Sequence, residues 1–522
     1  MHSRLKQILT SKTALPLLVF MLALSMRLYW IEQKKALYGD EFTSVSIAYD
    51  NPGWAEKTFP ADQTYTGQEL RALLYTDGGK GFKGMTDDLS VLHTDNGDRS
   101  HASLYYMALR CALTGNQTAT MDSVMKRGCM LNLLFFTLSF TGMWLLLRKQ
   151  FATNPSLATG CLLVAFLNPA SISNTLLLRE YAMAEAAFSL WAYWCLCFLL
   201  RLKKTQPGSL TLLGTGIALA ACLLSCGYFN LFFFGITLCC LLWTSFHHQK
   251  RVAIGHILLL AACSILLCKW MYSGYFNFLT DVRTQEVSEK LQGTNWLTNI
   301  RASAKSGILM FVLHIASPIG LVAMIIPIVL SAFRYKRNTM PILRSQGMWL
   351  FGCACIWSLL ALLFSPWKLT HYLYPALPLC MSLIAWLALT ACHRLPKAVT
   401  RIFLMLFVFS SCYPRAVEHT GQEYARTFWP RTSPVVALYG PDCWERNSLT
   451  QLSPFLGERQ KCIIAADTSE IHRQISSTEP KDTLYVYADK DCPMLRTIDG
   501  YLYERPFNHW MHAYLYTGKR NR

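Results

Sequence analysis

Long apolar runs recur along most of this chain, and they constrain its fold more than any other feature. Hydrophobic residues make up 52% of the 522 residues and charged residues only 15%, against about 25% charged in soluble domains. About 20 apolar residues in a helix cross the hydrocarbon of a bilayer. We therefore predict a polytopic α-helical membrane protein with about eleven spans, near 14–31, 129–147, 157–173, 181–200, 209–226, 228–246, 252–272, 307–331, 347–364, 372–391 and 400–414.

The first apolar run fits either a cleaved signal peptide or a membrane span. Arg4, Lys6 and Lys12 precede it, as basic residues precede a signal peptide. No small-residue cleavage site follows. Arg27-Leu28-Tyr29-Trp30 is typical of side chains that anchor a helix at a membrane interface. We expect this segment to remain as the first span.

Lys and Arg are concentrated in one set of alternate loops, which predicts the orientation. Such loops are usually cytoplasmic. The N-terminus is therefore predicted to be cytoplasmic, and an odd number of spans places the C-terminal tail outside. The formal net charge of +18 then reflects topology, which argues against a nucleic acid partner. The residues of this set are Arg4, Lys6, Lys12, Arg148, Lys149, Arg201, Lys203, Lys204, Lys250, Arg251, Arg334, Lys336, Arg337, Arg344, Arg394, Lys397 and Arg401.

The chain divides into a membrane body over residues 1–413, which includes an external loop over 32–125, and an extracytoplasmic tail over 414–522. Short β-branched runs alternate with helical stretches in the tail, which predicts a small α/β domain. No glycine-rich phosphate loop follows its strands, so a lid, a scaffold or an acceptor-binding module is expected. The predicted strands are Val435–Gly440, Cys462–Ala466, Thr483–Ala488 and Ala513–Thr517, and the predicted helix is Thr468–Ile475.

Most of the 19 cysteines lie inside apolar spans, where cysteine behaves as a small hydrophobic residue. Cys111, Cys443, Cys462 and Cys492 fall within external segments. A disulfide among the last three is left open, because the sequence does not select a pairing. The sequence does not contain the two CxxC pairs that are typical of a structural zinc site.

Asp40 and Glu41 form an acidic pair just after the first span, on the predicted outer face. Two carboxylates so close to hydrocarbon are costly unless a site uses them. The alternative is the first turn of a helix, where the macrodipole favours acidic side chains.

A second acidic cluster ends the first loop and includes Asp95, Asp98 and His101. Leu104-Tyr105-Tyr106 begins an amphipathic stretch directly after it, which we expect to lie along the membrane surface. The alternative for the two aspartates is an Asn-Gly turn with solvated charges.

Arg179-Glu180-Tyr181 begins the fourth predicted span after a very short external loop. An arginine at a helix N-terminus opposes the helix dipole, so helix stability does not explain it. A guanidinium that binds two phosphate oxygens would explain an arginine at this position. Snorkelling of the side chain to the interface is the alternative.

Lys368, His371 and Tyr372 lie in the external loop before the tenth predicted span, followed by Pro375. Lys368 and His371 are candidates for binding a phosphate group. The alternatives are an aromatic belt for the tyrosine and a snorkelling lysine. All these candidates come from loops far apart in sequence and fall on one predicted face of the membrane.

These motifs, in this order, resemble the GT-C glycosyltransferases, which are polytopic enzymes that use polyprenyl-phosphate sugars. An acidic pair follows the first span, and Arg179-Glu180-Tyr181 fits an Arg-x-Tyr segment. His101-Ala102-Ser103-Leu104-Tyr105-Tyr106 keeps the histidine and the Leu-Tyr-Tyr of a family motif but lacks its prolines. His371-Tyr372 stands where many members carry Arg-Tyr. The branches compared are the protein O-mannosyltransferases and the lipid A aminoarabinose transferases.

The resemblance implies a role for each candidate residue. Asp40 would be the base that activates the acceptor hydroxyl, with inversion at the anomeric carbon. Glu41 would either orient the acceptor or hold Arg179. Donor-phosphate binding would fall to Arg179, Tyr181, Lys368, His371 and Tyr372, and substrate binding to Asp95, Asp98 and His101.

The partners implied are a polyprenyl-phosphate-linked sugar, membrane lipid, and a glycolipid, glycan or protein acceptor. No cofactor is certain, and a divalent metal is left open because Asp, Glu and His can bind a hard cation. The expected location is a bacterial inner membrane with the site outside. The alternative function is a transporter or flippase of lipid-linked glycans, which would show charges at the bilayer midplane and an internal repeat.

Overall fold

The computed structural model describes most residues of 13–49, 63–280, 296–329 and 347–421, together with 434–438, 452–465, 483–489 and 497–520. These residues group into two compact units. The first contains 1–33, 98–105 and 129–420, and the second contains 34–97, 106–128 and 421–522. Each unit is described by itself.

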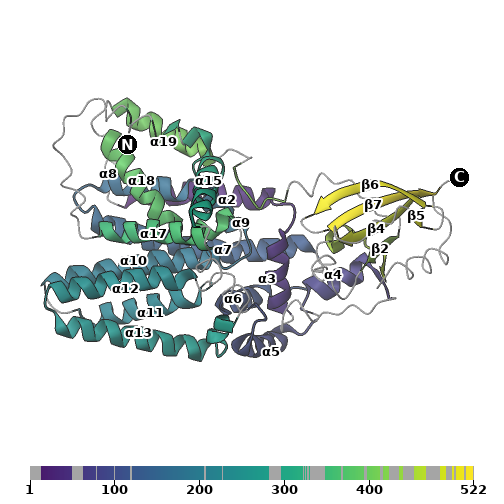
Figure 1. Ribbon diagram of the computed structural model, residues 1–522, viewed down its shortest axis with the longest axis horizontal. Helices are drawn as coiled ribbons and strands as arrows, with labels where there is room; N and C mark the ends of the chain where they lie inside the picture. Colours follow the sequence, from purple (N-terminus) through teal and green to yellow (C-terminus); the bar gives the residue numbers. More distant parts are fainter. Residues whose placement is uncertain are drawn as a thin grey trace, which may run out of the picture. The chain divides into compact units, whose positions relative to one another are not determined.

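The first unit is helical (Figure 1). Among the residues that the structure describes, five helices are long and apolar enough to cross a membrane, and the bent pair α8–α9 would be a sixth span. The chain is therefore a polytopic α-helical membrane protein, and the predicted number of eleven spans stays a prediction. The helices are α2 (Ala14–Gln33), α7 (Met121–Gln150), α8 (Pro155–Phe166), α9 (Pro169–Leu176), α10 (Tyr181–Lys204), α11 (Ser209–Leu224), α12 (Phe229–His247), α13 (Arg251–Met271), η1 (Tyr275–Thr280), α15 (Trp296–Met310), the π-helix η2 (Phe311–Ile315), α17 (Met348–Phe364), η4 (Thr370–Ala376), α18 (Leu377–Cys392) and α19 (Lys397–Ser411).

The break between α8 and α9 bends the chain by 55° and follows from an Asn-Pro pair. Asn168 precedes Pro169, and a residue before proline is disfavoured in helical conformation. The Asn168 side chain instead accepts the Ser171 N–H at 2.9 Å and caps the new helix. The local sequence thus ends one helix and begins the next within the membrane body.

The second unit combines short helices from the first loop with one mixed sheet (Figure 1). Its strand order is β1-β3-β2-β4-β7-β6-β5, with β2 parallel to both β3 and β4. The elements are α3 (Gly39–Tyr49), β1 (Thr64–Thr66), α4 (Gly67–Tyr75), α5 (Gly81–Thr94), α6 (Leu104–Leu113), β2 (Val435–Leu438), η6 (Ser453–Phe455), β3 (Lys461–Ala465), β4 (Thr483–Asp489), β5 (Thr497–Ile498), β6 (Tyr501–Trp510) and β7 (Ala513–Arg520). The first residues of α6 belong to the first unit, and the first residues of α7, up to Gly128, belong to the second.

The four strands predicted in the tail appear as β2, β3, β4 and β7. The first loop adds β1, which pairs antiparallel with β3. Arg71 of α4 also donates to the carbonyls of Ser453 and Leu456. The boundary near 413 stays a prediction, and the predicted helix at 468–475 lies outside the described residues.

Arg27 differs from the expected interfacial anchor. None of its surface is exposed, and its guanidinium stacks over Phe136 at 3.8 Å from the ring centroid. Its aromatic neighbours in the sequence led us to expect Arg27 at the membrane interface. Hydrogen bonds to α8 and α9 instead hold it inside the first unit.

Candidate functional site

Asp98, His101, Arg179 and Glu180 form a buried polar cluster in the first unit. The Arg179 Nη2 lies 3.6 Å from Asp98 Oδ2, and its Nε lies 3.3 Å from Glu180 Oε2. His101 Nδ1 lies 2.7 Å from Glu180 Oε1, and His101 Nε2 lies 3.4 Å from Arg179 Nη2. Three residues proposed from the sequence are thus brought together.

Short turns on both sides of the cluster set its geometry. The His101 N–H donates to the Asp98 carbonyl at 2.9 Å, just before α6. Arg179 follows α9 and donates its own N–H to the Leu177 carbonyl at 2.8 Å. A Cβ on Gly227 would come within 2.6 Å of the Ser100 carbonyl, so glycine allows this close approach of two backbones.

The charges of the cluster are arranged around the guanidinium. Burial alone would raise the pKa of Glu180, but Arg179 and His101 hold the pKa of that carboxyl well below its usual range. A carboxylate only accepts, so a proton on His101 Nδ1 would face Glu180. The cluster sets the direction of the Arg179 guanidinium, which lies near Asp98, His101 and Glu180.

A group of aromatic and ionisable side chains surrounds Tyr374 in the same unit. The His371 ring lies 5.0 Å from the Tyr181 ring and 6.0 Å from the His419 ring, centroid to centroid. The Tyr374 hydroxyl donates to Glu418 Oε2 at 3.3 Å. This group brings together three predicted residues, Tyr181, His371 and Tyr372, the last at 4.7 Å from His371 between ring centroids.

Glu418 connects this group to two further helices. Its N–H donates to Ser173 Oγ of α9 at 2.9 Å, and its Oε1 lies 3.7 Å from His314 Nδ1 of η2. Burial raises the pKa of the Glu418 carboxyl, while the nearby His314 opposes that shift. The carboxylate of Glu418 is thus held between Tyr374 and His314, while Ser173 holds its backbone.

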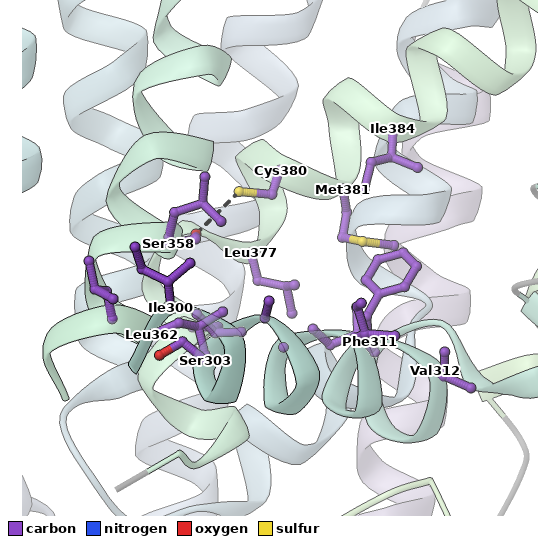
Figure 2. A pocket seen from close by; sticks show the side chains of 17 residues that line it. Ile300, Ser303, Phe311, Val312, Ser358, Leu362, Leu377, Cys380, Met381 and Ile384 are labelled. Atoms are coloured by element: carbon purple, nitrogen blue, oxygen red, sulfur yellow. Dashed lines mark hydrogen bonds between the residues drawn. The ribbon is translucent and has the colours of Figure 1, made fainter. Parts of the chain in front are cut away.

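An apolar cavity of about 690 Å³ lies between α15, η2, α17, η4 and α18. Figure 2 shows Phe311 and Val312 on one side of it and Leu377, Met381 and Ile384 on another. The side chains that line it are apolar except for Ser303, Ser358 and Cys380, and the last two contact each other at 3.5 Å. The cavity has the size of a pocket for one medium-sized organic ligand.

Two elements of the cavity wall also carry polar groups of the Tyr374 cluster. Leu373 of η4 lines the cavity, and its neighbours are Tyr372 and Tyr374. On η2, Phe311 and Ile315 line the cavity while His314 faces Glu418. The helices η4 and η2 thus each contribute both to the apolar cavity wall and to the polar group around Tyr374.

Lys368 is engaged by the end of α17. Its ammonium donates to the Leu362, Leu363 and Ser365 carbonyls. A cation there satisfies the last carbonyls of a helix and favours its dipole. This explains the position of Lys368 without a ligand.

Asp40 and Glu41 begin α3 in the second unit, and they differ sharply. Glu41 is fully buried, lies 2.9 Å from the buried Lys34 ammonium, and accepts the Tyr38 N–H. The Asp40 carboxylate is half-buried, and within the described part of the chain it has no hydrogen-bond or ion-pair partner. One acid anchors the turn and the other is available.

The other residues singled out from the sequence are Asp95 and the cysteines of the tail. Asp95 accepts the Gly97 N–H at 3.0 Å in a turn after α5. Cys462 is buried and unpaired, and burial raises its thiol pKa to about 12; Cys443 and Cys492 lie outside the described residues. Among the residues that the structure describes, no group of three or more His, Cys, Asp or Glu is arranged to hold a metal.

Sequence reasoning gave no role to Glu180, Tyr374 or Glu418. The first two stand within or beside segments already singled out, so their position was a usable signal. Glu418 follows the last helix in a stretch with no motif, and only the fold reveals its neighbours. Lys34 was likewise missed because nothing local links it to Glu41.

No protein-family model and no curated protein matches the chain. Among solved structures, it is similar to ArnT from Cupriavidus metallidurans bound to undecaprenyl phosphate, at 12% identity and a TM-score of 0.46, covering 96% of this chain and 97% of that one. It is also similar to the archaeal oligosaccharyltransferase AglB from Archaeoglobus fulgidus, in complex with an inhibitory peptide and a dolichol-phosphate, at 12% identity and a TM-score of 0.42, covering 90% and 69%.

Both neighbours are GT-C glycosyltransferases, the group that the sequence motifs resemble. At such identity and with TM-scores below 0.5, these likenesses carry no inference about activity. We therefore base the proposed function on the residues of this chain.

Proposed function

We propose that this protein is a membrane glycosyltransferase that moves a sugar from a polyprenyl-phosphate donor to an extracytoplasmic acceptor. One observation carries the proposal: a 690 Å³ apolar cavity shares two wall elements with a cluster of His, Tyr and Glu side chains. A long hydrocarbon tail ending in a phosphate and a sugar matches this combination of apolar volume and polar groups.

In this proposal the cavity holds part of the polyprenyl chain. The phosphate is bound by Arg179, with Tyr181, His371 and Tyr372, and its developing charge is stabilised as the sugar leaves. Lys368 has the smaller share, because its ammonium already caps α17. Asp98 and His101 bind the sugar and hold Arg179 in place.

Asp40 is the proposed general base. It takes the proton of the acceptor hydroxyl as that oxygen attacks the anomeric carbon, and the bond from that carbon to the phosphate oxygen breaks. A single displacement of this kind inverts the anomeric centre. No partner in the described part of the chain engages its carboxylate, which suits it to the task, whereas Glu41 is committed to Lys34 and keeps α3 in place.

The proposed acceptor is a glycolipid, glycan or protein on the outer side of a bacterial inner membrane, with the N-terminus in the cytoplasm. Mass spectrometry of envelope lipids, glycans and glycoproteins tests the function. Cells with no protein and cells with Asp40→Asn should both lack one sugar modification and accumulate its polyprenyl donor. If Asp40→Asn restored the modification, transport of the donor would replace transfer as the function.

A further inference from the structure

Arg27 is a fully buried cation within α2, a helix long and apolar enough to cross a membrane. A charge in such a span is costly and is usually kept for a function. The proposed chemistry does not use this residue, and its burial excludes the interfacial role that the sequence predicted. Its contacts therefore have to explain it.

The guanidinium joins the two halves of the broken pair α8–α9. Its Nη1 donates to the carbonyl of Phe166, the last residue of α8, at 3.0 Å. Its Nη2 donates to the Ser171 carbonyl at 3.1 Å and to Ser171 Oγ at 2.6 Å. Its Nε donates to Thr175 Oγ1 at 3.0 Å, so one side chain contacts both sides of the bend.

These contacts supply hydrogen bonds to backbone groups at the bend. Carbonyls released at a helix break have no water to bind inside a membrane, and leaving them unpaired is expensive. The planar fork of an arginine serves several acceptors at once. A lysine or a glutamine at this position could not reach the same set.

The buried Glu185 of α10 accepts a hydrogen bond from Asn174 Nδ2 of α9 at 2.8 Å, and it lies close enough to Arg27 to attract the guanidinium. The 55° bend is thus fixed by a network across α2, α9 and α10.

The orientation of α9 determines the position of Arg179, which follows the C-terminal end of this helix. The Asn132 amide holds the end of this helix by donating to the Leu177 carbonyl at 2.6 Å, and Arg179 donates its N–H to the same carbonyl. A rotation of α9 would therefore move Arg179 away from Asp98 and His101.

We propose that Arg27 is a positioning residue that holds the α8–α9 bend and thereby places Arg179 for the phosphate of the lipid donor. The inference rests on the proposed function. Arg27 does not touch the donor; it acts through α9.

The test compares two ligands with the same tail, undecaprenyl phosphate and undecaprenol, bound to the purified full chain in nanodiscs. The ratio of their dissociation constants measures phosphate recognition alone. We expect the wild type to prefer the phosphate at least about tenfold. Arg27→Gln and Arg27→Lys should lose most of this preference with little change in undecaprenol affinity. A purely structural defect would weaken both ligands together.

A matched control is Thr237→Val, which removes a buried hydrogen bond from Trp191 elsewhere in the body and should keep the wild-type ratio. If the Arg27 variants do not fold, Ser171→Ala with Thr175→Val removes two of the acceptors and should lower the ratio severalfold. An unchanged ratio in variants that fold overturns the positioning role. A wild type without phosphate preference would instead overturn the proposed function itself.

Discussion

The turn that begins α3 and the cluster around Arg179 solve the same problem in opposite ways. Both place ionisable side chains close to apolar surroundings. In α3 the two acids have separate roles. Glu41 forms an ion pair with Lys34, while the neighbouring carboxylate of Asp40 stays available. Around Arg179 every charged group also positions another. An entering phosphate must therefore compete with Asp98, whose contact is the longest of the guanidinium contacts. The first arrangement suits a proton acceptor and the second suits a preorganised binding group.

The largest expected effect concerns Asp40. Asp40→Asn should lower turnover about 10²–10⁴-fold, the usual contribution of a general base, with donor affinity unchanged. Initial rates with the purified protein and the acceptor identified by mass spectrometry would measure this. Near-normal turnover would show that the available carboxylate is not the base.

Glu41→Gln should lower the stability of the fold. It leaves the Lys34 ammonium buried without its partner, which costs about 3–5 kcal/mol. The apparent melting temperature in detergent should drop for Glu41→Gln and stay near the wild type for Asp40→Asn. Equal melting temperatures for the two variants would contradict the division of work in α3.

Glu180→Gln should cost about 1–3 kcal/mol at neutral pH, because Arg179 and His101 lose a charged partner. The pKa of Glu180 is held below its ordinary value of 4.5. Its contribution is thus fully present above that value and is lost as the pH falls toward the folded-state pKa. Melting curves of the variant and wild type should converge below pH 4.5, and a gap that stays constant with pH would contradict the ion pair.

Arg179→Lys keeps the charge but loses the planar fork, so donor affinity should weaken by about tenfold, or 1.4 kcal/mol. The Michaelis constant for the acceptor should not change. Titration with undecaprenyl phosphate provides the measurement, and an unaltered dissociation constant would remove Arg179 from the donor site.

The smallest effect is expected at Lys368. Lys368→Gln removes a helix cap, which is worth about 0.3–1 kcal/mol, and should reduce donor affinity only slightly. The same titration as for Arg179→Lys compares the two cations. A loss at Lys368 as large as that at Arg179 would make the loop lysine the main phosphate ligand.

The sequence predicted the polytopic helical class and several residues that meet in the fold. Asp98, His101 and Arg179 could be found because each stands in a loop on one predicted face. The single unbroken span predicted over 157–173 was wrong, because the chain breaks there into α8 and α9. The Asn168-Pro169 pair was a local signal for this break that the prediction did not use. By contrast, the depth of Arg27 and the partners of Glu41 and Glu418 depend on segments distant in sequence. Local patterns carry no information about such pairings, and they also missed β1, a strand of three residues.

The pairing of β1 with β3 has a consequence for biogenesis. Thr64–Thr66 is synthesised well before its partner Lys461–Ala465, because the described helices from α7 to α19 lie between the two strands in sequence. The second unit therefore cannot complete its sheet until those helices have been made, and long-range pairing of this kind is slow. Until then the earlier segment needs protection from wrong partners. This part of the protein thus matures after those helices have been made, and not when the first helix is inserted.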